Sequence, residues 1–104
     1  MIFQQEEPRQ RLMIHGNVIT FRREEHKLGR DWAVEKRCGH KLCNIYVAEL
    51  TTHNSLEGLV DFRDLEPFVK LSGFDTLKGW QDAIYLRSHM VNPVGHLYFV
   101  SKTL

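Results

Sequence analysis

The chain has 104 residues, of which 42% are hydrophobic and 26% are charged, so it suits one folded domain and not a disordered chain. Fourteen lysine and arginine residues against thirteen aspartate and glutamate residues give a formal net charge of +1. Because most nucleic-acid-binding modules carry a larger basic excess, any contact with nucleic acid must come from local clustering of basic residues.

The first half of the chain predicts one helix followed by three strands. A helix is expected over residues 4–14, a strand over 17–23, a short strand around Trp32 and Val34, and a strand over 42–50. Glu6 and Glu7 suit the positive end of the helix dipole, and Gly16 can end the helix. The last of these strands is the strongest prediction, since it is rich in β-branched and aromatic residues.

The second half predicts two helices and a closing strand. A short helix over 62–71 is interrupted at Pro67, a second helix follows Asp75, and the closing strand begins at His96. Asp75 is predicted to be the N-cap of the second helix. Trp80 falls on the apolar stripe of that helix and is predicted to pack in the core. The order of elements predicts a small α+β domain with a mixed sheet, and one domain over residues 1–104.

The strand G-N-V-I-T-F-R has two unlike faces. Side chains alternate along a strand, so Ile19 and Phe21 share one face while Val18, Thr20 and Arg22 share the other. The first face is typical of a core. The second carries two strong hydrogen-bonding groups, which favour either a polar cleft or a solvated face of the sheet.

Five segments together resemble the ASCH domains, which are relatives of the PUA RNA-binding domains. The segments that carry the resemblance are GNVITFR, KLGRDWAV, CNIYVAEL, SGFDTLKGW and GHLYFVS. The resemblance implies a PUA/ASCH-like β-barrel with flanking helices and a cleft between barrel and helices. It also implies that Thr20 and Arg22 line this cleft.

The function that follows from this resemblance is the binding of RNA or a nucleotide-like ligand in the cleft beside the first strand. Basic residues cluster between Arg22 and Lys41, where they could meet phosphate groups, although a solvated charged face is the alternative. An exposed Trp32 in that cluster could stack an unpaired base. The predicted binding residues are Asn17, Thr20, Arg22, Arg23, Lys27, Arg30, Ser72 and Asp75.

The sequence leaves two other functions open. Some ASCH proteins are amidohydrolases that act on acetylcytidine with a lysine, a threonine and a glutamate, and their threonine falls on Thr20 as the catalytic residue. The lysine position is Asn17 in this chain, and the glutamate position falls near Ser72 and Gly73. A threonine hydroxyl needs an adjacent base to act as a nucleophile, and an amide cannot supply one. A protein-interaction module without a small ligand is the third possibility.

Metal, cofactor and membrane functions have little support in the sequence. Cys38, His40 and Cys43 lack the paired spacing of zinc knuckles, so no metal and no cofactor are predicted. No apolar run approaches the roughly 20 residues of a membrane span. The first ten residues lack a signal-peptide pattern, so we expect a cytoplasmic protein.

Overall fold

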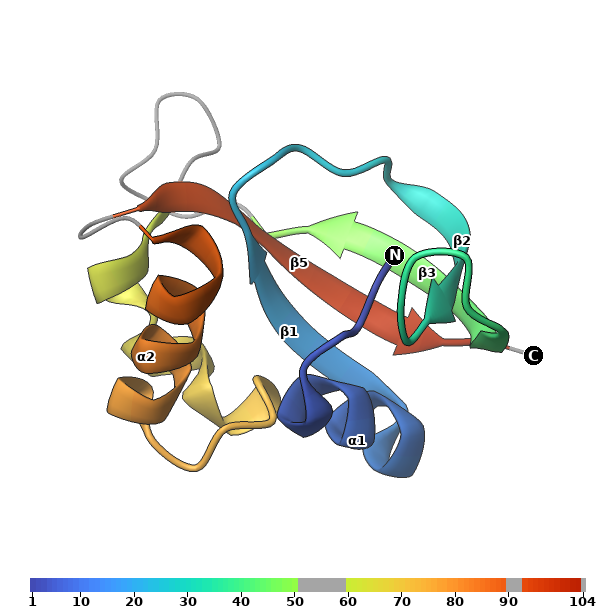
Figure 1. Cartoon of the computed structure of the whole chain (residues 1–104), viewed down its shortest axis with the longest axis horizontal. Helices are drawn as coiled ribbons and strands as arrows, with labels where there is room; N and C mark the ends of the chain where they lie inside the picture. Colours follow the sequence, from blue (N-terminus) through green and yellow to red (C-terminus); the bar gives the residue numbers. More distant parts are fainter. Residues whose placement is uncertain (51–59, 90–92, 104) are drawn as a thin grey trace.

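Four antiparallel strands form the sheet at the centre of the fold, in the spatial order β1-β5-β3-β2 (Figure 1). The structure is a computed structural model and describes residues 1–50, 60–89 and 93–103. The strands are β1 (Asn17–Arg22), β2 (Gly29–Val34), β3 (Lys41–Glu49), β4 (Val60–Asp61) and β5 (Val94–Lys102). The helices are α1 (Glu6–His15), the 3-10 helices η1 (Phe62–Asp64) and η2 (Glu66–Leu71), and α2 (Leu77–Ser88). The two-residue strand β4 pairs with the start of β5.

The sheet is open, so the predicted β-barrel is wrong. β1 and β2 stand at opposite ends of the strand order, and each pairs with one neighbouring strand, β5 and β3 respectively. The N-terminal segment occupies the outer edge of β2, where the Phe3 N–H donates to the Val34 carbonyl at 2.7 Å and the Val34 N–H donates to the Met1 carbonyl at 3.0 Å. Because these groups are already bonded, β1 cannot close a barrel at that position.

The predicted mixed sheet is also wrong, since all the strand pairs in the described residues are antiparallel. A parallel contact occurs as the isolated bridge between Ile2 and Val34. The α+β class itself is correct. In the described residues no helix has the length and apolar character needed to cross a lipid bilayer.

Each side of the sheet is covered by a different part of the chain (Figure 1). We call the side that packs on the N-terminal segment and α1 the α1 face, and the side that packs on η2 and α2 the α2 face. The core of the α1 face consists of Met1, Phe3, Leu12, Val18, Ala33, Ile45, Val47, Tyr98 and Val100. The core of the α2 face consists of Ile19, Phe21, Leu65, Trp80, Ile84 and Leu97.

Strand β1 therefore lies between two cores. The structure confirms that Ile19 and Phe21 belong to a core, but Val18 is also fully buried on the opposite side. The α1 face of β1 is apolar at Val18 and becomes polar only toward Thr20 and Arg22, near the end of the strand. The tertiary position of α1 and the N-terminal segment produces this second core, so the alternation in the sequence could not indicate it.

Helix α2 begins one residue later than predicted. Thr76 is the N-cap, and its Oγ1 accepts a hydrogen bond from the Gly79 N–H at 3.0 Å. Asp75 is exposed and does not cap the helix, because the extended backbone of Thr76 places its own hydroxyl at the first turn. Trp80 is buried in the core of the α2 face, as predicted.

Candidate ligand-binding cavity

A cavity of about 360 Å³ opens along the edge of β1 that no described strand pairs. Its walls come from the N-terminal segment, from β1 and the residues after it, from the turn at Ser72, and from α2. The lining side chains include Phe3, Gln4, Thr20, Arg22, Arg23, His26, Ser72, Trp80 and Arg87. The volume falls within the range of roughly 300–1,000 Å³ that is usual for small-molecule pockets.

Arg22 is the central polar group of the cavity. Its Nε donates to Thr20 Oγ1 at 3.1 Å, and its guanidinium carbon lies 5.1 Å from the centre of the Phe3 ring. In the part of the chain that the structure describes, the two terminal guanidinium nitrogens have no hydrogen-bond acceptor, and no carboxylate lies within ion-pair distance of them. The donors at the end of Arg22 are therefore available to a ligand.

The surroundings of Arg22 disfavour the positive charge of its side chain. The residue is partly accessible as a whole, but protein surrounds its guanidinium group, and this burial lowers the pKa of Arg22 to about 10. The positive charge of Arg87 lowers the pKa further, and Tyr98 opposes these effects only in part. At neutral pH the side chain is still cationic, so the cavity holds a desolvated positive charge.

A second guanidinium group stands at the rim. Arg87 lies on the exposed side of α2, and its Nη1 donates to Gln4 Oε1 of the N-terminal segment. This contact joins α2 to the opposite wall of the cavity. Glu24 and Glu25 also border the cavity but are exposed, and neither pairs with Arg22. The rim is thus mixed in charge, while the interior around Arg22 is positive.

Ser72 supports the wall of the cavity through its own turn. Its hydroxyl donates to the Val69 carbonyl at 2.6 Å and accepts from the Phe74 N–H at 3.1 Å, and the residue is buried. Both bonds fix the connection between η2 and α2. The hydroxyl is therefore already bonded within the protein, and its main effect is to hold this turn against the cavity.

The structure brings four of the eight predicted binding residues to this cavity and places the other four elsewhere. Thr20, Arg22, Arg23 and Ser72 line it, whereas the remaining predicted residues are Asn17, Lys27, Arg30 and Asp75. Asn17 lies at the far end of β1 and accepts a bond from Arg11 Nη2 at 3.0 Å through its Oδ1. Arg30 lies on β2, and both Lys27 and Asp75 are exposed outside the cavity.

Several lining residues were not found from the sequence. Phe3, Gln4 and Arg87 come from segments that are distant along the chain, and no local motif marks them. Arg87 lies on the exposed side of an amphipathic helix, where a basic residue usually indicates only solvation. Their role follows from the close approach of α2 to the N-terminal segment.

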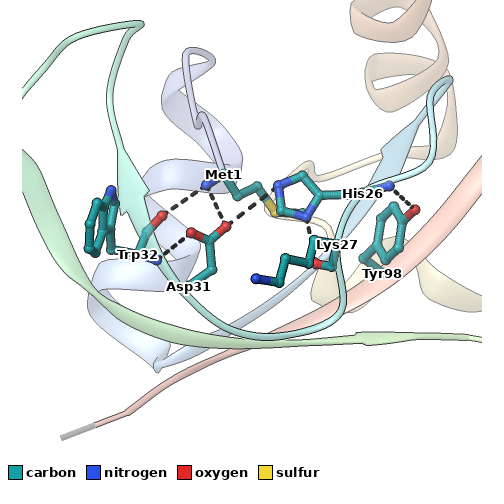
Figure 2. A network of polar contacts seen from close by, with 6 residues as sticks. All are labelled: Met1, His26, Lys27, Asp31, Trp32 and Tyr98. Carbon is teal, nitrogen blue, oxygen red and sulfur yellow. Dashed lines mark hydrogen bonds and ion pairs between the residues drawn. The ribbon is translucent and has the colours of Figure 1, made fainter.

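A network of polar contacts holds the segment that follows β1, which is one wall of the cavity. Figure 2 shows the Asp31 carboxylate pointing toward Met1 and His26, while the Trp32 ring points away from them. Asp31 Oδ2 accepts from the α-ammonium group of Met1 at 2.8 Å and lies 3.5 Å from His26 Nε2. The backbone N–H of His26 donates to the Tyr98 hydroxyl at 2.6 Å. These contacts tie the segment to β2 and β5.

The charge of Asp31 is stabilised in this network. Burial raises the pKa of Asp31, but the hydrogen bond from the Met1 ammonium group, the bond from the Trp32 N–H and the charges of Met1 and His26 outweigh it, and the net effect lowers the pKa. A carboxyl whose pKa is lower in the folded state stabilises the fold above its unfolded pKa of about 3.9. That contribution disappears as the pH falls through the folded pKa.

We expect Asp31→Asn to lower the free energy of unfolding at pH 7 and to have a progressively smaller effect as the pH falls from about 4 through the lower folded pKa of Asp31, because protonation removes the charge from the wild-type protein over that range. Urea denaturation at pH 7, 5 and 3 measures the difference. Asp75→Asn, at an exposed position, is the matched control and should change stability little at each pH. An effect of Asp31→Asn that is the same at pH 7 and pH 3 would contradict the proposed stabilisation of the charge.

A histidine–glutamate pair lies nearby but outside the cavity. His96 Nδ1 is 2.6 Å from Glu49 Oε1, and the His96 ring stacks on Tyr98 with ring centres 6.0 Å apart. Neither His96 nor Glu49 lines the cavity. Within residues 1–50, 60–89 and 93–103, no group of three or more metal-binding side chains occurs, and Cys38 and Cys43 are not joined by a disulfide.

Comparisons with protein-family models, with curated proteins and with solved structures gave no match to this chain. The resemblance to ASCH domains therefore stays a prediction, and the functional argument depends on the geometry of the cavity.

Proposed function

We propose that the cavity beside β1 binds a nucleotide-like ligand, free or at the end of an RNA strand, with a phosphate group on Arg22. The observation that carries this proposal is a desolvated guanidinium group with no carboxylate partner in the described residues. Arg22 keeps its charge at neutral pH without a carboxylate partner in the described residues, so an anionic ligand in the cavity would supply the missing counter-charge.

The chemistry of Arg22 suits phosphate. Its planar guanidinium group can form two parallel hydrogen bonds to a phosphate, and such charge-assisted bonds are stronger where water is excluded. The hydrogen bond from Arg22 Nε to Thr20 Oγ1 fixes the guanidinium group, so its two terminal nitrogens keep one orientation. Arg87 adds a second positive charge at the rim, which supports binding of a doubly charged phosphate.

The rest of the cavity suits a ring system with polar edges. Phe3, Phe74 and Trp80 supply apolar and aromatic wall. The edge of β1 next to the cavity offers backbone donors and acceptors, because no described strand pairs along it. These two features are what a base needs, since bases are held by apolar contact on their faces and hydrogen bonds at their edges.

The test is direct titration with the four nucleoside 5′-monophosphates and with the matching nucleosides, followed by calorimetry and by tryptophan fluorescence in a Trp32→Ala background, where Trp80 is the remaining tryptophan. At least one monophosphate should bind at least tenfold more tightly than its nucleoside, since two charge-assisted bonds are gained. Arg22→Met should abolish this difference. Arg63→Met, which changes an exposed arginine outside the cavity, should leave it unchanged.

Two outcomes would contradict the proposal. One is a monophosphate that binds no better than its nucleoside, and the other is an Arg22→Met protein that keeps the difference. Unfolding of the variant does not obscure the result, because removing an unpaired buried charge should leave the thermal midpoint equal or higher, which circular dichroism checks.

Hydrolysis of acetylcytidine has no supporting observation in the described residues. Thr20 Oγ1 accepts its hydrogen bond from Arg22, Asn17 lies at the other end of β1, and Asp75 does not line the cavity. A positioned base contributes roughly a hundred- to ten-thousand-fold to the rate of such a reaction. Binding is therefore the function that the geometry favours.

A further inference from the structure

Two exposed aromatic side chains project from the α2 face of the sheet, on β2 and β3. Trp32 of β2 is 58% exposed and Tyr46 of β3 is 51% exposed. The pairing register places Trp32 opposite Asn44 and Arg30 opposite Tyr46, so these four side chains share one side of the sheet. Ser101 of β5, opposite Tyr46, adjoins them. We call these residues, together with Lys41, the aromatic patch.

The aromatic patch lies on the α2 face of the sheet, next to the core of that face and outside its margin. Phe99 and Ala48 are a cross-strand pair on this side, and Phe99 still packs against the core that contains Trp80. The next pair outward is Ser101 and Tyr46, which is where the exposed side chains begin. An exposed tryptophan and tyrosine on neighbouring strands are unusual for a surface that contacts only water.

Positive charge surrounds the two rings. Lys41 Nζ lies 6.0 Å from the centre of the Trp32 ring and donates to Asn44 Oδ1 at 2.9 Å. Arg30 is exposed beside Tyr46. A groove runs between β2 and β3 at the patch, and Asp31 is the one acidic residue among the described residues that line it. The Asp31 carboxylate is bound on the other side of the sheet, by Met1 and His26.

We propose that the aromatic patch binds single-stranded nucleic acid, with one base stacked on Trp32, one on Tyr46, and the backbone phosphates on Arg30 and Lys41. Trp32 and Tyr46 stand at diagonal positions of an antiparallel pair, and such positions are roughly 7–8 Å apart. That separation suits consecutive bases of an extended strand, each on its own ring. Exposed aromatic rings with flanking cations are how proteins hold unpaired bases without strict sequence preference.

This surface is separate from the cavity and does not depend on the function proposed for it. The cavity lies along the edge of β1 and is lined by Thr20 and Arg22, whereas the patch lies on β2, β3 and the end of β5. No residue lines both. A failure at one site can therefore be told apart from a failure at the other by separate variants.

The experiment is fluorescence anisotropy with a labelled ten-nucleotide single-stranded RNA, the same sequence as DNA, and a double-stranded RNA of equal length. We expect both single strands to bind and the duplex to bind at least tenfold more weakly, because its bases are not free to stack. Trp32→Ala and Tyr46→Ala should each weaken binding about tenfold. Lys41→Gln and Arg30→Gln should each reduce the slope of log affinity against log salt by about 0.7.

Two control variants make the result specific. Tyr85→Ala removes an aromatic side chain on α2 that is 50% exposed, close to the value for Tyr46, and it should leave RNA affinity within twofold of wild type. Arg63→Met, at an exposed arginine that lines neither the cavity nor the groove of the patch, should also keep RNA affinity, while Trp32→Ala should keep nucleotide binding in the cavity.

The proposal is overturned if Trp32→Ala and Tyr46→Ala bind RNA as well as wild type, if Tyr85→Ala is equally harmful, or if the duplex binds as tightly as the single strands. It is also overturned if the patch instead joins two copies of the chain. Sedimentation would then show that the wild-type protein is a dimer and that the Trp32→Ala protein is a monomer. The wild-type dimer would not bind RNA.

Discussion

Ile19→Asp is expected to abolish the cooperative unfolding transition, so that the protein is largely unfolded at 25 °C. Ile19 is 4% exposed, and its side chain packs in the core between β1 and α2. An aspartate there would be a buried charge without a partner, which costs several kcal/mol in addition to the lost apolar contact. Small domains are stable by about 5–15 kcal/mol, so this change removes most or all of the margin. Circular dichroism against temperature and urea measures the loss.

Ile14→Asp provides the matched control for that prediction. The same substitution is made on α1, at a side chain that is 73% exposed. The new charge stays in water, and its position near the C-terminus of the helix costs only about 0.3–1 kcal/mol. A folded Ile14→Asp protein beside an unfolded Ile19→Asp protein would confirm the orientation of β1. Similar losses in both would show that the burial of β1 has been assigned to the wrong residues.

Gly73→Ala is expected to lower the free energy of unfolding by about 2–5 kcal/mol, from backbone strain and a steric clash together. Gly73 has a φ angle of +92°, which side-chain-bearing residues rarely adopt. A methyl group there would also lie 2.4 Å from the Glu7 carbonyl oxygen and 2.9 Å from Pro8 Cα. Because both contacts are with the backbone of α1, the turn between η2 and α2 would have to move away from that helix.

Gly29→Ala separates the two causes. Gly29 has a nearly equal φ angle of +94°, but an added methyl group would meet nothing within 4 Å. This variant should lose only the strain, about 1–2 kcal/mol. The difference between the variants in urea denaturation then measures the clash with α1. If Gly29→Ala is as destabilising as Gly73→Ala, the close approach of the turn to α1 has no energetic consequence.

The local elements could be predicted from the sequence because each depends on residues that are neighbours in the chain. Helix α1 begins near Glu6 and ends before Gly16, and that glycine has the left-handed conformation expected for a C-cap. Strand β3 matches its apolar pattern, and Trp80 is buried on the predicted stripe of α2. The N-cap of α2 is Thr76, one residue after the predicted Asp75. Aspartate and threonine are both good N-caps, so the sequence could not choose between them, and the backbone conformation makes the choice.

The candidate site was predictable only in part. Thr20 and Arg22 were identified because two polar groups alternate with buried apolar ones along β1. Their partners in the cavity, Phe3 and Arg87, come from opposite ends of the chain, and nothing in their own neighbourhoods indicates that they meet. Arg22 and Arg30 look alike in the sequence, yet one is desolvated in a cavity and the other is exposed on the aromatic patch.

The sequence by itself determined the α+β class, the order of the main helices and strands, and the membership of Ile19 and Phe21 in a core, since periodicity and capping are local properties of the chain. Only the tertiary structure decided that the sheet stays open, that Val18 is buried beneath the N-terminal segment, and that the cavity forms at the edge of β1. These features depend on which edge the N-terminal segment bonds to. That choice is a competition between contacts far apart in the chain, and no local pattern records its outcome.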